Sequence, residues 1–169
     1  MDSDDDIVYV KATESATRKA LIDASATQSM SGKTITGPAP VETVAATNVI
    51  TAAESGTTFF LSHATEFVST LPAPAAGLRY SFIVANAPET ASYTIVTNGS
   101  SNIILGQIYT VDVDSATNPE FVTAGVDTIT LVDSKAVVGD RVDVICDGTN
   151  WFAYGFCSVF DAITFDTAS

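Results

Sequence analysis

The chain has few residues of the kinds that form catalytic and metal centres: one histidine and two cysteines among 169 residues. A zinc site takes about four Cys or His ligands, or three with a water, and this set does not supply them. Nucleophilic catalysis needs a nucleophile, a base and an orienting group. His63 follows Ser62 directly, and adjacent residues on a strand point to opposite faces. The sequence therefore predicts a protein that is not an enzyme, with no catalytic residues, no metal site and no cofactor.

Clustered bases and long apolar runs are also missing. Seven bases stand against twenty acids, which gives a net charge of −13, whereas phosphate binding needs grouped Lys and Arg side chains. No apolar run approaches the roughly 20 residues of a membrane helix. The stretch Met1-Asp-Ser-Asp-Asp-Asp6 is acidic where a signal peptide is basic. We expect no nucleic-acid partner and no membrane partner.

The two cysteines flank a turn near the end of the chain. With Gly148-Thr149 as a two-residue loop, Cys146 lies opposite Trp151. Cys157 then lies opposite Asp140, about 20 Å further along the ladder. A disulfide needs Cα atoms within about 7 Å, so the sequence predicts two reduced thiols, which suits assembly in a cytoplasm.

Composition divides the chain into two parts. Residues 1–40 are rich in Ala, Ser and Thr, contain a possible short helix at 14–22, and end in an extended stretch with Pro38 and Pro40. We interpret them as an extended N-terminal arm and residues 41–169 as a β-rich body. The arm carries six acids and four bases, and the body carries fourteen acids and three bases. Either the body faces solvent while the arm touches a partner, or the charge reflects drift or a salty habitat.

The body has the pattern of an all-β domain, because short apolar-alternating runs recur between turns spaced about 8–12 residues apart. We expect an antiparallel β-sandwich of jelly-roll type, or a small β-barrel, preceded by the extended arm. Asn98-Gly99 has the composition of a hairpin turn. The expected strands cover 57–61, 78–84, 92–97, 103–105, 107–114, 127–132, 141–146, 151–156 and 158–165.

The last two long strands are apolar on both faces. The hairpin register puts one set on the face predicted as core: Val142, Val144, Cys146, Trp151, Ala153 and Cys157. Phe152, Tyr154 and Phe156 then point the other way, on the face of Arg141, Asp143 and Ile145. Three aromatics in a row form a large apolar patch for a monomer. Either a second layer of the domain covers them or another subunit does, and the small size of the domain favours the subunit.

Three segments resemble structural proteins of tailed bacteriophages, especially marine ones. Residues 26–38 (ATQSMSGKTITGP) resemble a phrase that precedes β-rich modules in phage fibres and spikes. Residues 69–83 (STLPAPAAGLRYSFI) and 139–151 (GDRVDVICDGTNW) resemble two further phrases of these proteins, the latter a closing hairpin. Such phrases occur in capsid decoration (cement) proteins and in fibre or knob domains.

The resemblance implies a non-enzymatic virion structural protein. A chain of 169 residues has no room for the shaft of a fibre, so we expect a decoration protein at the capsid surface, assembled in the host cytoplasm. It would bind the major capsid protein through its arm and form a homotrimer. The alternative is a short trimeric head-fibre, tail-fibre or adaptor protein that binds host surface glycans.

The expected contact residues follow from this interpretation. In the arm, apolar and basic side chains are predicted to meet the capsid: Ile7, Tyr9, Arg18, Lys19, Leu21, Ile22, Met30, Lys33 and Ile35. In the body, the predicted subunit interface consists of Phe152, Tyr154 and Phe156.

Overall fold

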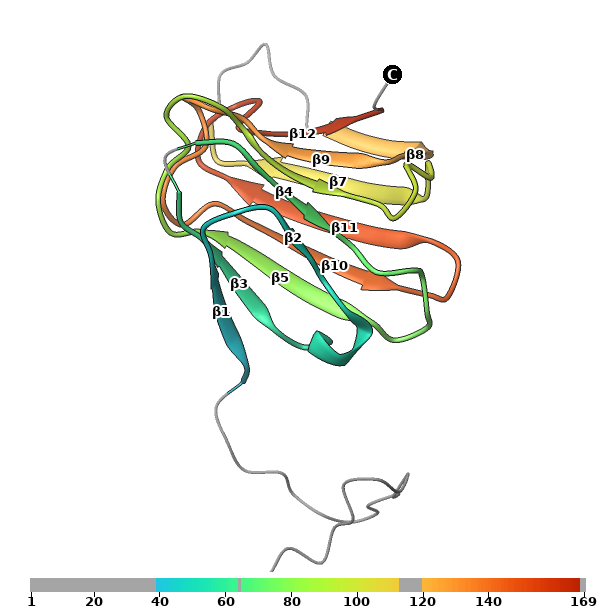
Figure 1. Cartoon of the computed structure of the whole chain (residues 1–169). Helices are drawn as coiled ribbons and strands as arrows, with labels where there is room; N and C mark the ends of the chain where they lie inside the picture. The colour runs from blue at the N-terminus through green and yellow to red at the C-terminus, as the bar shows by residue number, and fades with distance from the viewer. Residues whose placement is uncertain (1–38, 64, 113–119, 168–169) are drawn as a thin grey trace, which may run out of the picture. The chain divides into compact units, whose positions relative to one another are not determined.

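The computed structural model describes residues 39–63, 65–112 and 120–167, which form two β-sheets packed on each other (Figure 1). The predicted arm over residues 1–40, with its possible helix at 14–22, lies almost wholly outside these ranges. The described part is the body, and it contains the predicted subunit-contact residues.

Each sheet is open and has its own strand order. The larger sheet has seven strands in the order β1 (Val41–Val44), β3 (Thr58–Leu61), β5 (Arg79–Val84), β10 (Arg141–Cys146), β11 (Trp151–Cys157), β7 (Ile104–Thr110) and β8 (Glu120–Val126). The smaller sheet has five, in the order β12 (Ile163–Asp166), β9 (Thr128–Leu131), β6 (Tyr93–Val96), β4 (Phe67–Thr70) and β2 (Asn48–Val49). Helical structure in the described ranges is one 3-10 turn, η1 (Ala52–Glu54).

One hydrophobic core lies between the sheets. Alternate residues of each strand point into it, as the alternating buried and exposed positions of β10 and β11 show. Its largest fully buried side chains are aromatic: Trp151, Tyr80, Tyr93, Phe59, Phe67 and Phe82. Several of these rings touch, with Phe67 stacked on Tyr93 at 4.4 Å between centroids. Because each aromatic side chain has a large apolar area, a small number of them is enough to fill a core between short strands.

The predicted all-β class is confirmed, and the arrangement is a two-sheet sandwich. The sheets are mixed, however, where the sequence predicts an antiparallel sandwich, and the described strands do not close into the small barrel that is the alternative. From β1 to β7 the chain alternates between the sheets at every strand, so each return to a sheet runs in the same direction as the previous visit. The pairs β1–β3, β3–β5, β2–β4 and β4–β6 are parallel for this reason.

Some local predictions are wrong. Asn98-Gly99 does not close a hairpin, because β6 and β7 belong to different sheets and the turn carries the chain from one to the other. The expected strands at 103–105 and 107–114 are one strand, β7, and the expected strand at 158–165 shrinks to β12. Four strands are not among those predicted: β1, β2, β4 and β8.

The closing hairpin has the predicted register. Cys146 pairs with Trp151, and Arg141 pairs with Phe156. The Asp147 carboxylate accepts hydrogen bonds from the backbone N–H groups of Thr149 and Asn150, both at 2.8 Å. These two bonds hold the pKa of Asp147 below its usual value. The turn is therefore fixed by its own residues.

The prediction of two reduced thiols is confirmed. Cys146 and Cys157 are both free and buried. Burial raises the pKa of Cys157, and the nearby negative charge of Asp140 raises it further. Both cysteines therefore act as small core residues.

Candidate interaction surface

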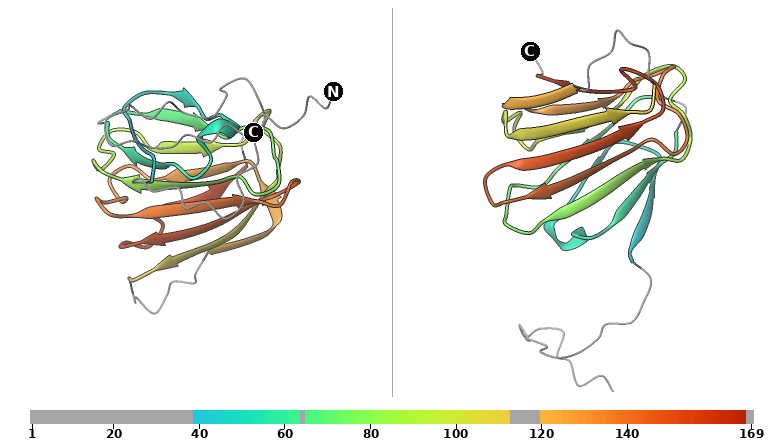
Figure 2. Two further views of the ribbon diagram at one scale, coloured as in Figure 1. Left: turned by 90° about the horizontal axis from the view of Figure 1, so that it is seen from below. Right: turned by 180° about the vertical axis from the view of Figure 1, so that it is seen from behind.

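The outer face of the seven-stranded sheet is the candidate functional surface. Figure 2 (right) looks onto this sheet, where β5, β10, β11 and β7 lie side by side. Residues that point outward from neighbouring strands form rows across the sheet, with Cβ atoms of paired residues about 4.5–5.5 Å apart. Strand register alone therefore fixes which outward side chains are neighbours.

Three such rows cross the face. The first runs through Phe60, Ile83, Arg141, Phe156 and Tyr109. The second runs through Thr58, Ser81, Asp143, Tyr154, Gln107 and Phe121. The third runs through Arg79, Ile145, Phe152 and Leu105.

Five aromatic residues on β11, β7 and β8 form what we call the aromatic patch: Phe152, Tyr154, Phe156, Tyr109 and Phe121. Four of the five side chains are well exposed, with Phe121 at 68% and Phe156 at 52%. The Tyr109 and Phe156 rings stack at 5.6 Å between centroids, and the Tyr109 hydroxyl donates a hydrogen bond to Gln107 Oε1 at 2.6 Å. The patch is thus ordered by its own contacts although it faces outward.

The sequence places Phe152, Tyr154 and Phe156 together on the face away from the core, and this is confirmed. Of the two covers considered, a second layer of the domain is not found among the described residues, because Tyr154 and Phe156 remain exposed. Tyr109 and Phe121 are not among the predicted contact residues. Tyr109 could have been found from the alternation along β7, which puts Gln107 and Tyr109 on the same outward face. Phe121 could not, because the sequence predicts no strand at β8.

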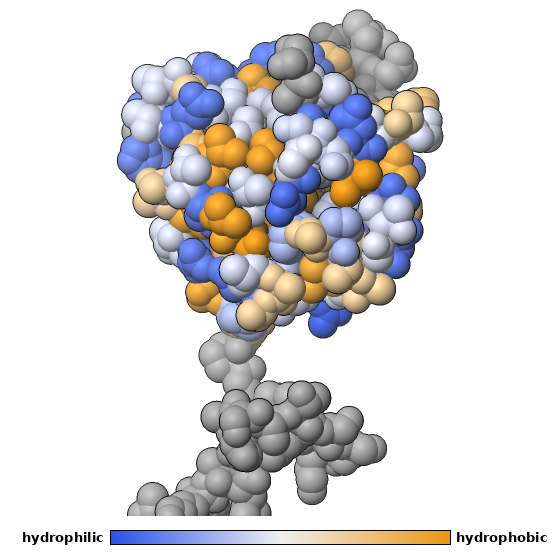
Figure 3. Space-filling model, turned by 45° about the vertical axis from the view of Figure 1, so that its right-hand side comes forward, coloured by the Kyte–Doolittle hydropathy of each residue, from blue (hydrophilic) through white to orange (hydrophobic). Residues whose placement is uncertain are grey.

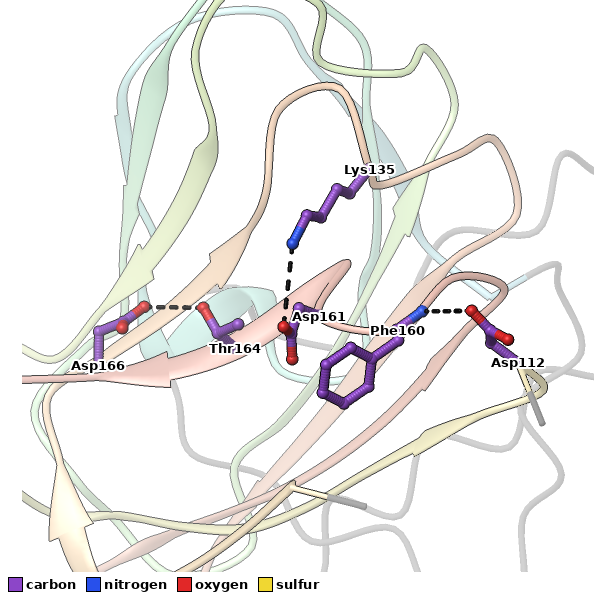
Figure 4. A network of polar contacts seen from close by, with 6 residues as sticks. All are labelled: Asp112, Lys135, Phe160, Asp161, Thr164 and Asp166. Atoms are coloured by element: carbon purple, nitrogen blue, oxygen red, sulfur yellow. Dashed lines mark hydrogen bonds and ion pairs between the residues drawn. The ribbon is translucent and has the colours of Figure 1, made fainter. Parts of the chain in front are cut away.

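Charge is distributed unevenly over the body. Of its three bases, Arg79 and Arg141 stand on the outer face of the seven-stranded sheet, and Asp143 is the one acid in the three rows. Arg141 forms an ion pair with Asp143. The third base, Lys135, lies beside β12 and pairs with Asp161 at 3.9 Å (Figure 4). The outer face therefore has a small positive excess on a body of net charge −11.

The side of the body drawn in Figure 3 has small groups of apolar residues, in orange, separated by polar ones. Among residues 39–63, 65–112 and 120–167, no three His, Cys, Asp or Glu side chains come together as a metal-binding group. The same part of the chain contains no helix with the length and hydropathy of a membrane span.

The predicted capsid-contact residues all lie outside the described ranges: Ile7, Tyr9, Arg18, Lys19, Leu21, Ile22, Met30, Lys33 and Ile35. The described candidate surface is therefore that of the body. Comparison of the chain with protein-family profiles, curated proteins and solved structures finds no match.

Proposed function

We propose that the protein is a non-enzymatic structural protein of a bacteriophage virion, which decorates and stabilises the capsid. The virion assignment is supported by the three segments that resemble phage structural proteins, residues 26–38, 69–83 and 139–151. The contact between copies is supported by the aromatic patch. Soluble monomers rarely expose contiguous apolar patches of more than a few hundred Å² unless the patch is used for binding. Five neighbouring aromatic side chains, interrupted by Gln107 and bordered by Arg141, fit a contact between copies of the body.

The charge pattern supports the same contact. A body of net charge −11 repels its copies over most of its surface. The rows that contain the aromatic patch hold two arginines and one acid, so this face lacks the concentrated negative charge that would oppose the approach of two bodies. We propose that bodies associate here as a trimer and that the arms of the trimer bind the major capsid protein together.

Substitutions in the aromatic patch test the subunit contact. The double variant Tyr109→Ser/Phe156→Ser removes the stacked pair of rings, which is exposed and outside the core. Truncating a central interface aromatic costs about 2 kcal/mol or more. The protein concentration at which the trimer half-dissociates should therefore rise at least about 30-fold. Light scattering coupled to size-exclusion chromatography measures the mass. The change Val49→Ser, at an exposed apolar residue of the other sheet, is the control and leaves the trimer intact. A double variant that stays trimeric, or a wild-type chain that is monomeric throughout, contradicts the proposed contact.

Deletion of residues 1–37 tests the arm. Residues 38–169 form a compact unit with its own core, so the shortened chain should fold and stay soluble. We expect the shortened chain to lose capsid binding, because the deletion removes the arms through which each trimer is proposed to bind. Several weak arm contacts acting together give the avidity of that binding. Co-sedimentation with capsids lacking the protein measures this. If the shortened chain still binds capsids, the arm is not the attachment, and the body itself must make the contact with the capsid.

A further inference from the structure

An open pocket of about 390 Å³ lies beside the aromatic patch on the outer face of the seven-stranded sheet. Outward residues of β5, β10 and β11 line it together with the turn before β3. Small-molecule sites in proteins start at about 300 Å³, so the pocket has room for one or two sugar rings. Its lining includes Arg79, Ser81, Asp143, Ile145, Tyr154 and Thr57.

Arg79 supplies an available positive charge. Within the described part of the chain its guanidinium has no ion-pair partner, whereas Arg141 and Lys135 each pair with an aspartate. Its backbone is held in place, because the Arg79 carbonyl accepts from the N–H of Gly56 at 2.8 Å and its own N–H donates to Ser55 Oγ at 3.2 Å. A guanidinium on such a base binds a carboxylate through two parallel hydrogen bonds.

Asp143 supplies acceptors. Its carboxylate receives the Ser81 hydroxyl at 2.6 Å and the Arg141 guanidinium. An ionised carboxylate has about four lone-pair sites, so two donors leave room for hydroxyl groups of a ligand. The same carboxylate repels a ligand that brings only negative charge. The pocket therefore favours a molecule that has both hydroxyl donors and one carboxylate.

Tyr154 and Ile145 supply an apolar wall, since both side chains are partly exposed and line the pocket. A pyranose ring has an apolar C–H face that packs on such a wall while its hydroxyls meet polar groups at the edge. A polyanion fits poorly, because one unpaired arginine neutralises one charge and the body has a net charge of −11. The required chemistry is that of a sugar acid.

We propose that this pocket binds a saccharide unit bearing a single carboxylate, of the hexuronic or sialic acid class. The ligand carboxylate lies on Arg79, ring hydroxyls donate to Asp143, and the C–H face packs on Tyr154. The site is separate from capsid attachment by the arm, but it shares Tyr154 with the aromatic patch. The inference therefore concerns a body whose patch is not covered by another copy. The pocket adds a ligand to the body whether or not the arm binds a capsid.

The test is a titration with glucuronate and with N-acetylneuraminate, followed by NMR chemical shifts. It uses the full-length chain and its Tyr109→Ser/Phe156→Ser variant, in which the proposed subunit contact is removed and Tyr154 is left in place. We expect saturable binding of at least one acid, with a Kd of about 1 mM, and shifts at β5 and β10. Arg79→Gln should weaken that binding at least about tenfold, because it removes the charge and the bidentate donor. Arg79 is exposed, so the variant should retain the fold. Lys135→Gln makes the same charge change at a distant ion pair and should bind like the wild type.

Three outcomes overturn the proposal. The first is no saturable binding of either acid by the wild-type chain or by the Tyr109→Ser/Phe156→Ser variant. The second is equal affinity in Arg79→Gln and the wild type, which would place the ligand elsewhere. The third is acetate binding as tightly as the sugar acids, which would make the pocket a site for any carboxylate, including one on a peptide. The mass of the chain in the same samples reports the trimer, so loss of assembly and loss of ligand are scored separately.

Discussion

Replacement of Trp151 by alanine is expected to destabilise the body by about 3–5 kcal/mol, the usual cost of removing a buried tryptophan. Trp151 is fully buried at the start of β11, where it pairs with Cys146 on one side and Ile104 on the other. Its ring packs near Tyr80 at 5.8 Å between centroids. Because Trp151 is the single tryptophan of the chain, its replacement also removes the tryptophan fluorescence signal. Urea unfolding should therefore be followed by circular dichroism.

The change Trp151→Phe is the matched control for that experiment. In the described structure the buried indole Nε1 has no hydrogen-bond partner, and a buried donor without a partner carries its desolvation cost uncompensated. Phenylalanine removes this donor and keeps an aromatic ring, so we expect a loss of only about 1 kcal/mol, within the range of shape-changing core swaps. Equal losses for the two variants would mean that the bicyclic shape, and not the buried area, stabilises this position.

The closing hairpin can be predicted from the sequence because its signals are local. Asp147, Gly148 and Asn150 fix a turn within four residues, and the period of two then assigns every outward and inward side chain of β10 and β11. The buried and exposed sets follow from that register alone. For this reason the sequence alone is enough to place Phe152, Tyr154 and Phe156 on one outward face.

The parallel pairs cannot be predicted in the same way. The chain between β3 and β5 passes through the other sheet. The sequence around β3 therefore holds no local signal for the strand that pairs with it. Such pairing is decided by how the two apolar faces close on one core, which is a property of the whole body. Strands as short as β2 and β4 are also hard to predict from the sequence, because two to four residues carry almost no periodic signal.

The pocket depends on this non-local pairing. Ser81 and Asp143 are 62 positions apart in the chain, and their hydrogen bond exists because β5 lies against β10. The hairpin register puts Asp143 on the outward face next to Tyr154, but it has no means of bringing Arg79 and Ser81 to it. The aromatic half of the surface is therefore a local feature of one hairpin, whereas the polar half is made by topology.

Gly106→Ala is expected to destabilise the body by about 3–5 kcal/mol, as much as the loss of Trp151. This is more than ordinary overpacking costs, because the added methyl group would meet backbone atoms and not a movable side chain. Gly106 pairs with Ala153 across β7 and β11. A Cβ there would fall well inside van der Waals distance of the Ala153 carbonyl oxygen and 2.8 Å from its carbonyl carbon. The two strands would have to separate, and thermal unfolding should report the loss.

Gly155→Ala adds the same methyl group on the neighbouring strand and provides the control. Its closest neighbour is Ile108 Cδ1, the end of a side chain that can turn away, so we expect a loss of about 1–2 kcal/mol. Similar losses for the two variants would show that β7 can move off β11 at little cost. The comparison also bears on assembly, because the approach of β7 to β11 at Gly106 is what lets Tyr109 stack on Phe156. Any folded fraction of Gly106→Ala should therefore be a weaker trimer than Gly155→Ala at the same concentration.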